Sequence, residues 1–367
     1  MSKTSIIGFL YATIKAAINK ALLWLLSIGF SIGLSIFLSF PHRYRMSHNN
    51  GIAGRGRVRI VEEPTFPPHD FFEPGRSFDC RIRHASATFL DDAMNCIRSF
   101  SIKFSNHWWD SPFDIEMNTG TINLFWSAAS FMKFGKLRKQ QWGVEYHDYY
   151  RIYPQGILGA QLSLRRNPIS FQNLRYQALT PYRFVGKDGI NRYAKYRTMP
   201  LDKAPETGIT PNMSDWDTCS QRILPTETRG RNYLKDEYKQ RMTNGGAHYL
   251  MQIQVRIASD DDNPEIFNNQ LPWDEEIFPW HDLAVVDITE TLPWKESLKT
   301  SFSLNHMPKN LGIIPAKSIF DYNSLNYMRS HSEMARKARL LSYRIFGYPP
   351  EIPDDDNRNV SDWNGKS

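Results

Sequence analysis

The 367-residue chain has few cysteines, and their spacing gives them no common role. Cys80, Cys96 and Cys219 are odd in number, and no two of them lie at the short spacing of a zinc-binding pair. The sequence therefore predicts neither a disulfide framework nor a structural zinc site. The sequons at Asn212 and Asn359 are too short to indicate secretion.

The body of the chain lacks the excess of positive charge that a nucleic-acid-binding protein carries. The formal net charge is +7, but eight of the 45 basic residues precede the first acidic residue, Glu62, which leaves 37 basic against 38 acidic residues. The eight are Lys3, Lys15, Lys20, Arg43, Arg45, Arg55, Arg57 and Arg59. Because they flank an apolar segment, they favour a membrane-proximal role and no nucleic-acid partner.

A phosphate-binding loop is also missing. Gly51, Gly54 and Gly56 lie close together, but no strand precedes them. The Walker lysine and the dinucleotide-binding spacing are both absent, so these glycines do not indicate a nucleotide site.

The long hydrophobic run lies near the N-terminus. Residues 21–40 carry no charge and would form a helix of about 30 Å, long enough to span a bilayer, which Pro41 is expected to end. Residues 6–20 are more amphipathic and suit a membrane interface. A cleaved signal peptide is the alternative, although no cleavage site is convincing. The sequence predicts a membrane anchor or amphipathic segment over residues 1–41, with its orientation and its compartment left open by basic residues on both flanks.

Residues 42–348 are predicted to form one α+β domain rich in antiparallel strands. Residues 183–196 predict a hairpin with a glycine-containing turn, and residues 249–257 alternate as a half-buried strand does. The aromatic content of 13% suits either an aromatic-lined cavity or a plain β-rich core. Residues 202–231 predict a surface excursion, and the acidic, polar tail at 349–367 is expected to be mobile.

A helix near the C-terminus carries Arg339 and Tyr343 one turn apart on the same face. The guanidinium is expected to hydrogen-bond the phenol oxygen, and a fixed cation favours the phenolate. A tyrosinate is one of the few protein groups that holds haem iron. These residues alone also fit an amphipathic helix with an incidental Arg/Tyr pair.

The run Arg-Leu-Leu-Ser-Tyr at 339–343 resembles the proximal-helix motif of the catalase superfamily, Arg-Leu-Phe-Ser-Tyr. Upstream, Arg45, His48, Gly51 and Gly56 match the family's distal segment, Arg-x-x-His followed by two glycines at fixed spacing. A lone histidine beside glycines is usually structural, but the register with the family favours a distal histidine. Arg45 would then face a haem propionate.

Two further blocks follow in the family's order. Residues 81–104 resemble a pair of family strands in which Arg83 would take the second propionate-facing position. The alternative for Arg83 and Arg98 is an ordinary strand-end charge. In the next block, Asn118 takes the place of the asparagine that completes the distal site. Aromatic residues then follow as a candidate pocket wall, or simply as core: Phe125, Trp126 and Phe131.

The resemblance implies a catalase-like antiparallel β-barrel with added helices and a C-terminal proximal haem helix, preceded by the N-terminal hydrophobic helix. The implied cofactor is haem b, with Tyr343 as the axial iron ligand and Arg339, Arg45 and Arg83 as cofactor-binding cations. His48 and Asn118 are the implied catalytic residues.

Three departures from catalases bear on the substrate. The chain ends soon after Tyr343. Pro350 stands where catalases carry an arginine, so one of the usual cations is missing, and Arg344 is the candidate substitute. Ser47 stands where catalases typically carry valine, and a hydroxyl there is similar to the coral-type allene oxide synthases. Hydrogen-bonded to His48, it would restrain the handling of hydrogen peroxide.

The sequence therefore favours a haem enzyme that cleaves the O–O bond of fatty-acid hydroperoxides by dehydration or rearrangement, with a lipoxygenase as candidate supplier of its substrate. His48 follows closely after the apolar run, which would put the site near the bilayer. One alternative is a catalase or peroxidase of small peroxides. Another is a non-enzymatic haem-binding or lipid-binding membrane protein.

Overall fold

The computed structural model describes residues 3–87, 90–140, 151–210 and 223–353 of the chain. Cys219, the sequons at Asn212 and Asn359 and most of the tail at 349–367 lie outside these ranges, so the predictions for them stay predictions.

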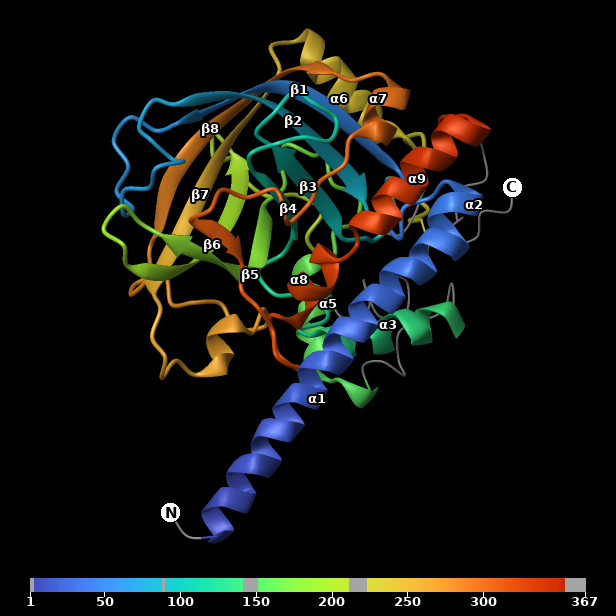
Figure 1. Cartoon of the computed structure of the whole chain (residues 1–367). Helices are drawn as coiled ribbons and strands as arrows, with labels where there is room; N and C mark the ends of the chain where they lie inside the picture. The colour runs from blue at the N-terminus through green and yellow to red at the C-terminus, as the bar shows by residue number, and fades with distance from the viewer. Residues whose placement is uncertain (1–2, 88–89, 141–150, 211–222, 354–367) are drawn as a thin grey trace.

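The core is a closed barrel of eight antiparallel strands, as the resemblance implied (Figure 1). The strands are β1 (Gly51–Ile60), β2 (Ser77–Ser86), β3 (Arg98–Lys103), β4 (Asp114–Thr119), β5 (Tyr176–Val185), β6 (Asn191–Pro200), β7 (Ala247–Ile257) and β8 (Trp280–Thr291). They are hydrogen-bonded in the order β4-β3-β2-β1-β8-β7-β6-β5, and β4 pairs with β5 to close the barrel through Asn118 and Gln177. A short strand, β9 (Leu311–Ile313), extends the sheet beside β5.

Alternation along the strands sorts the side chains into two groups. On β2, Ile82 and His84 point into the barrel, where Ile82 joins the apolar core, so Arg83 points to the outer face. On β4, Ile115 and Met117 are core residues, which places Glu116 on the opposite face. The outer face of β2, β3 and β4 therefore carries the polar residues.

Helices cover this outer face and the ends of the barrel. They are α3 (Ala128–Gln140), α5 (Gln155–Ser163), α6 (Tyr233–Thr243), α7 (Trp294–Lys299), α8 (Ser324–Ser330) and α9 (Glu333–Phe346), with a 3-10 turn η3 (Pro264–Phe267). Helix α9 is the C-terminal helix that the Arg339 and Tyr343 block predicted. Gly347 follows its last residue, and the φ of 77° at this position lies in the left-handed region that favours glycine.

The N-terminal hydrophobic helix is present as predicted. Helix α1 (Lys3–Leu34) continues through a π-helical turn, η1 (Ser35–Ser39), into α2 (Phe40–His42), so Pro41 lies inside the last turn. Residues 7–42 are long and apolar enough to span a membrane, although a signal sequence or a core helix has the same composition. Figure 1 shows the N-terminal half projecting from the domain.

The C-terminal half of this helix is packed against the domain, which the sequence did not reveal. Its buried residues recur at every fourth position, at Leu23, Ser27, Ser31, Ser35 and Ser39. Ser342 of α9 donates a hydrogen bond of 3.3 Å to the carbonyl of Ser39. Small side chains let helices approach closely, so the apolar run at 21–40 has one face on the domain and one face exposed.

The strand predictions for residues 183–196 and 249–257 agree with β5, β6 and β7. Val185 pairs with Asn191 across the turn. However, β7 is buried on both faces and not on one, because a loop covers its outer side. Gln254 Nε2 donates to the carbonyl of Phe278 at 2.5 Å, which satisfies the buried amide.

Candidate functional site

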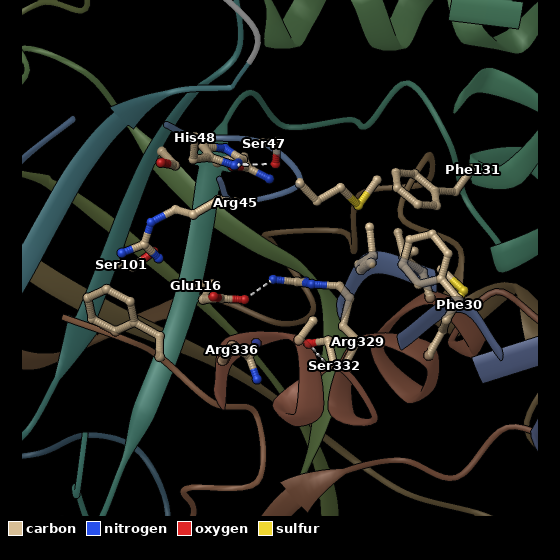
Figure 2. A pocket seen from close by; sticks show the side chains of 18 of the residues that line it. Phe30, Arg45, Ser47, His48, Ser101, Glu116, Phe131, Arg329, Ser332 and Arg336 are labelled. Carbon is tan, nitrogen blue, oxygen red and sulfur yellow. Dashed lines mark hydrogen bonds and ion pairs between the residues drawn. The ribbon is translucent and has the colours of Figure 1, made fainter. Parts of the chain in front are cut away.

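A cavity of about 260 Å³ lies between the outer face of the barrel and the helices α1, α8 and α9. His48, Asn118 and Arg339 all line it, although the sequence separates them by up to 291 positions. It is thus the place where most of the sequence-predicted site residues meet. Figure 2 shows Arg45, His48 and Phe131 among them.

His48 lies in the segment just before β1 and has an unusual backbone conformation. Its φ is 65°, which non-glycine residues seldom adopt. Arg83 compensates by donating two hydrogen bonds to this segment, from Nη1 to the carbonyl of His48 at 2.8 Å and from Nη2 to that of Asn49 at 3.1 Å. Strain of this kind persists only where surrounding contacts determine the conformation, and it concentrates at functional sites.

The two nitrogens of the His48 ring differ in their surroundings. Nδ1 lies 2.6 Å from the hydroxyl of Ser47, whereas the buried Nε2 has no hydrogen-bond partner among the described residues (Figure 2). Burial, and then the charge of Arg83, lowers the pKa of His48 to about 3. The ring is therefore neutral at physiological pH.

Gly51 and Gly56 lie where the structure leaves no room for a side chain. A Cβ at Gly51 would lie 2.3 Å from the carbonyl oxygen of His84, and one at Gly56 would lie 1.9 Å from that of Asp287. Both positions sit where β1 is pressed against a neighbouring strand. Side chains here would displace the strand that delivers His48.

Arg45 and Arg83 approach the cavity from the distal segment and from β2. Arg45 Nη2 donates to the carbonyls of Leu298 at 3.0 Å and Thr300 at 2.8 Å. The Nε atoms of Arg45 and Arg83 are buried without a partner in the described part of the chain. Burial lowers the pKa of Arg83 to about 10 and lowers the pKa of Arg45 well below its usual value, and the guanidinium group of arginine remains charged in proteins.

On α9, Arg339 and Tyr343 do not form the hydrogen bond that their spacing predicted. Arg339 Nη2 donates to the hydroxyl of Ser301 at 3.0 Å, and the Tyr343 hydroxyl donates to the carbonyl of Arg43 at 3.3 Å. Tertiary partners on either side draw the two groups apart, although both side chains are buried. Arg339 lines the cavity, while Tyr343 lies one turn along the helix, beyond its lining.

An ion pair in the cavity wall was missed by sequence reasoning. Glu116 of β4 accepts a hydrogen bond from Arg329 of α8 (Figure 2). Burial opposes ionisation of Glu116, but Arg329 and Arg336 outweigh it and lower its pKa below the usual value. The two partners are 213 positions apart, so no local pattern connects them.

Arg336 of α9 is a further cavity residue that the sequence did not indicate. It lines the cavity, and its buried Nη1 has no hydrogen-bond partner within the described ranges. Arg344, the candidate substitute for the missing third cation, is exposed instead. The position of Arg336, three residues before Arg339 on the same face of α9, was the available signal.

The predicted aromatic wall is only partly assembled. Phe125 and Phe131 line the cavity with their ring centroids 4.9 Å apart. Trp126 is not among the lining residues, and its ring packs against Tyr153 at 5.1 Å. Arg98 is fully buried and donates to the carbonyls of Asp92 at 2.8 Å and Met94 at 2.5 Å, so it tethers a loop and is no exposed strand-end charge.

The electrostatics of the cavity fit an anionic cofactor. Its charged lining residues are Arg45, Arg83, Arg329, Arg336, Arg339 and Glu116. Four of the five guanidinium groups have a buried nitrogen without a partner among the residues described. Unpaired buried cations are costly, so such a cluster is expected to meet carboxylates of a ligand. The two propionates of a haem are a group of this kind.

The barrel and its covering helices define a protein of catalase-like fold. The crystal structure of a fungal catalase superimposes on 82% of this chain and 62% of that chain, with a TM-score of 0.56 and 14% sequence identity. At this identity the likeness shows the fold alone.

Sequence comparison relates the chain to two proteins of fatty-acid oxidation by their names. The chain is 38% identical to the allene oxide synthase-lipoxygenase protein of Plexaura homomalla over 78% of its own length, and 28% identical over 68% to a linolenate 9R-lipoxygenase of Nostoc sp.. It spans 27% and 32% of the length of these relatives, and no protein-family model matches it. The fold is therefore catalase-like, and over 78% of its length the sequence is similar to a segment of the allene oxide synthase-lipoxygenase protein.

Proposed function

We propose that this protein is a haem-dependent enzyme that converts organic hydroperoxides, fatty-acid hydroperoxides in particular, by cleavage of the O–O bond in a dehydration or rearrangement. The observation that carries this proposal is the pairing of a neutral histidine, whose Nε2 has no hydrogen-bond partner among the described residues, with a cluster of buried cations in one cavity. The names of the relatives, an allene oxide synthase-lipoxygenase protein and a lipoxygenase, favour a fatty-acid substrate.

The residues that would hold haem b surround the cavity. Arg45, Arg83 and Arg336 have buried nitrogens available for the propionates, and Arg336 supplies the third cation in place of the exposed Arg344. Tyr343, one turn beyond the cavity lining on α9, is the residue that would hold the iron; its hydroxyl donates to the carbonyl of Arg43. Arg339 lies one turn away on α9, where its Nη2 donates to the hydroxyl of Ser301. When bound, the ferric haem supplies the iron that polarises the peroxide and assists cleavage of the O–O bond.

The chain's own groups handle protons. In a dehydration the hydroperoxide loses its terminal oxygen as water, which carries away the hydrogen already on that oxygen and one hydrogen from the carbon chain. The neutral Nε2 of His48 is able to accept a proton and pass it to the leaving hydroxyl. The amide of Asn118, which lines the same cavity, is placed to hydrogen-bond a peroxide oxygen.

Ser47 supports an organic hydroperoxide over hydrogen peroxide. Its hydroxyl, 2.6 Å from Nδ1 of His48, restrains the orientation of the ring. A ring held in one orientation is less suited to the proton relay that the reaction of a second hydrogen peroxide molecule requires.

The surroundings of the cavity suit a lipid-derived substrate. The helix spanning residues 7–42 is apolar enough to enter a bilayer, and we propose that it attaches the protein to a membrane. Oxidised fatty acids partition there. A dioxygenation of the lipoxygenase class is the reaction that must supply a fatty-acid hydroperoxide.

The test compares the purified wild-type protein with Tyr343→Phe. We expect a high-spin ferric haem spectrum in the wild type, altered or lost in the variant. Addition of a polyunsaturated fatty-acid hydroperoxide should then remove the conjugated-diene absorbance rapidly in the wild type.

Oxygen evolution from hydrogen peroxide is the parallel measurement. Rapid oxygen evolution with an unchanged diene band would replace the proposal with a small-peroxide enzyme. Properly folded protein that binds no haem, or a function unaltered by His48→Ala, would support a non-enzymatic role.

A further inference from the structure

The cavity has a polar end and an apolar end, and the N-terminal helix builds part of the apolar one. Phe30 and Leu34 of α1 line it together with Phe131, Leu325 and Met328. The rings of Phe30 and Phe131 meet edge to face with centroids 6.2 Å apart. Figure 2 shows this pair on the side of the cavity away from His48.

The same helix continues outward as an uncovered apolar rod. Phe9 is 69% exposed and Ile18 is 60% exposed, whereas Leu23 is only 1% exposed. The change falls where α1 meets the domain, and the helix is unbroken across it. The segment suited to a bilayer and the wall of the cavity are therefore successive parts of one helix.

Resting on the proposed function, we propose that α1 is the acyl-chain wall of the site, and that a fatty-acid hydroperoxide enters along it directly from the bilayer. The chain lies against Phe30 and Leu34 while the hydroperoxide group reaches His48. Each methylene of the acyl chain that passes from the bilayer to this wall avoids contact with water. The lipid therefore does not have to cross the aqueous phase to reach the site. Phe30 and Leu34 then determine which chains fit.

The wall is tested with Phe30→Ala against a matched control, Phe37→Ala, whose side chain is 75% exposed on the same helical segment. For linoleic acid hydroperoxide we expect KM to rise about ten-fold in Phe30→Ala, with kcat little changed, because apolar contact with the chain is lost. For tert-butyl hydroperoxide KM should stay constant in both variants. Equal effects of Phe30→Ala on the two substrates, or no effect on either, would overturn the proposal that Phe30 contacts the acyl chain.

A second variant guards against a folding defect. Phe30→Trp keeps the aromatic contact with Phe131 but fills the cavity, so it should disfavour the longer hydroperoxides selectively. Calorimetric binding of unreactive linoleic acid separates this inference from the proposed function, since it requires no turnover. Binding that is weakened in Phe30→Ala and kept in Phe37→Ala supports the wall even if no hydroperoxide reacts; unchanged binding in both rejects it.

The entry route is tested in phosphatidylcholine vesicles that carry the full chain and a fixed mole fraction of linoleic acid hydroperoxide. If the substrate enters from the bilayer, the rate stays constant when the vesicles are diluted in buffer. A rate that follows the aqueous concentration of the hydroperoxide would overturn the bilayer route.

Discussion

The hydroxyl of Ser47 lies 2.6 Å from Nδ1 of His48, its neighbour in the chain. Adjacent side chains usually point apart, and the left-handed backbone of His48, with φ of 65°, is what brings these two together. The hydrogen bond assigns the opposite nitrogen, Nε2, to the cavity. One backbone angle thus sets the direction of the proposed base.

Replacing Ser47 by valine should release the ring of His48. We expect Ser47→Val to increase oxygen evolution from hydrogen peroxide by about ten-fold, the value of one hydrogen bond of this kind. Ser47→Thr keeps the hydroxyl and serves as the control. Equal oxygen evolution in the two variants would show that the hydroxyl has no such role.

The pH dependence of turnover should lack a histidine transition. Because burial and Arg83 lower the pKa of His48 to about 3, the ring remains a neutral base down to about pH 4. We expect kcat/KM for a fatty-acid hydroperoxide to stay level from pH 8 to pH 5. A loss of activity centred near pH 6.5 would contradict a buried, neutral His48.

Stability should respond to acid through His84, which lies inside the barrel with Nε2 2.8 Å from the Tyr249 hydroxyl. Burial lowers the pKa of His84 to about 3, so between pH 6.5 and 3 the unfolded state binds a proton that the folded state does not. The free energy of unfolding is therefore largest above pH 6.5 and falls by up to about 1.4 kcal/mol per pH unit below it. Urea denaturation at pH 7.5 and pH 5 measures this. His84→Phe should reduce the pH dependence, whereas His42→Gln, on the exposed surface, should not.

Arg336 should contribute to haem affinity where Arg344 does not. Arg336 lies in the cavity wall, and its buried Nη1 has no partner in the part of the chain that the structure describes, while Arg344 is exposed on the same helix. We expect Arg336→Gln to weaken haem binding about ten-fold in a Soret titration, because a buried charge-assisted hydrogen bond is lost. Arg344→Gln should bind haem as the wild type does, and equal losses in both variants would refute the assignment.

Gly56 should tolerate no side chain. A Cβ there would lie 1.9 Å from the carbonyl oxygen of Asp287, whereas one at Gly312 would meet nothing within 4 Å. We expect Gly56→Ala to lower the free energy of unfolding by about 2 kcal/mol or more, and Gly312→Ala to have little effect. Denaturant titration of both variants provides the comparison.

Much of the fold was accessible from the sequence because its signals are local. The alternation at 249–257, the turn between β5 and β6, and the motif around Arg339 each occupy one short stretch. Burial on both faces of β7 was missed, because the covering loop at Phe278 is distant in sequence.

The site was less accessible because several of its contacts join remote segments. Glu116 meets Arg329, and Phe30 meets Phe131, through tertiary packing that no periodicity encodes. Trp126 follows Phe125 directly, yet its ring packs on Tyr153. The resemblance to a family indicates only the residues at motif positions. The N-terminal helix lies outside every motif, so its place in the cavity wall could not be predicted.

The placement of Phe30, Leu34 and Ser39 in the cavity wall has a consequence for maturation of the protein. A peptidase that removed the N-terminal helix as a leader would also open the cavity to water on its apolar side. A shortened recombinant chain beginning after residue 41 would lack Phe30 and Leu34 in the cavity wall, and with them the proposed acyl-chain contact and the proposed membrane attachment.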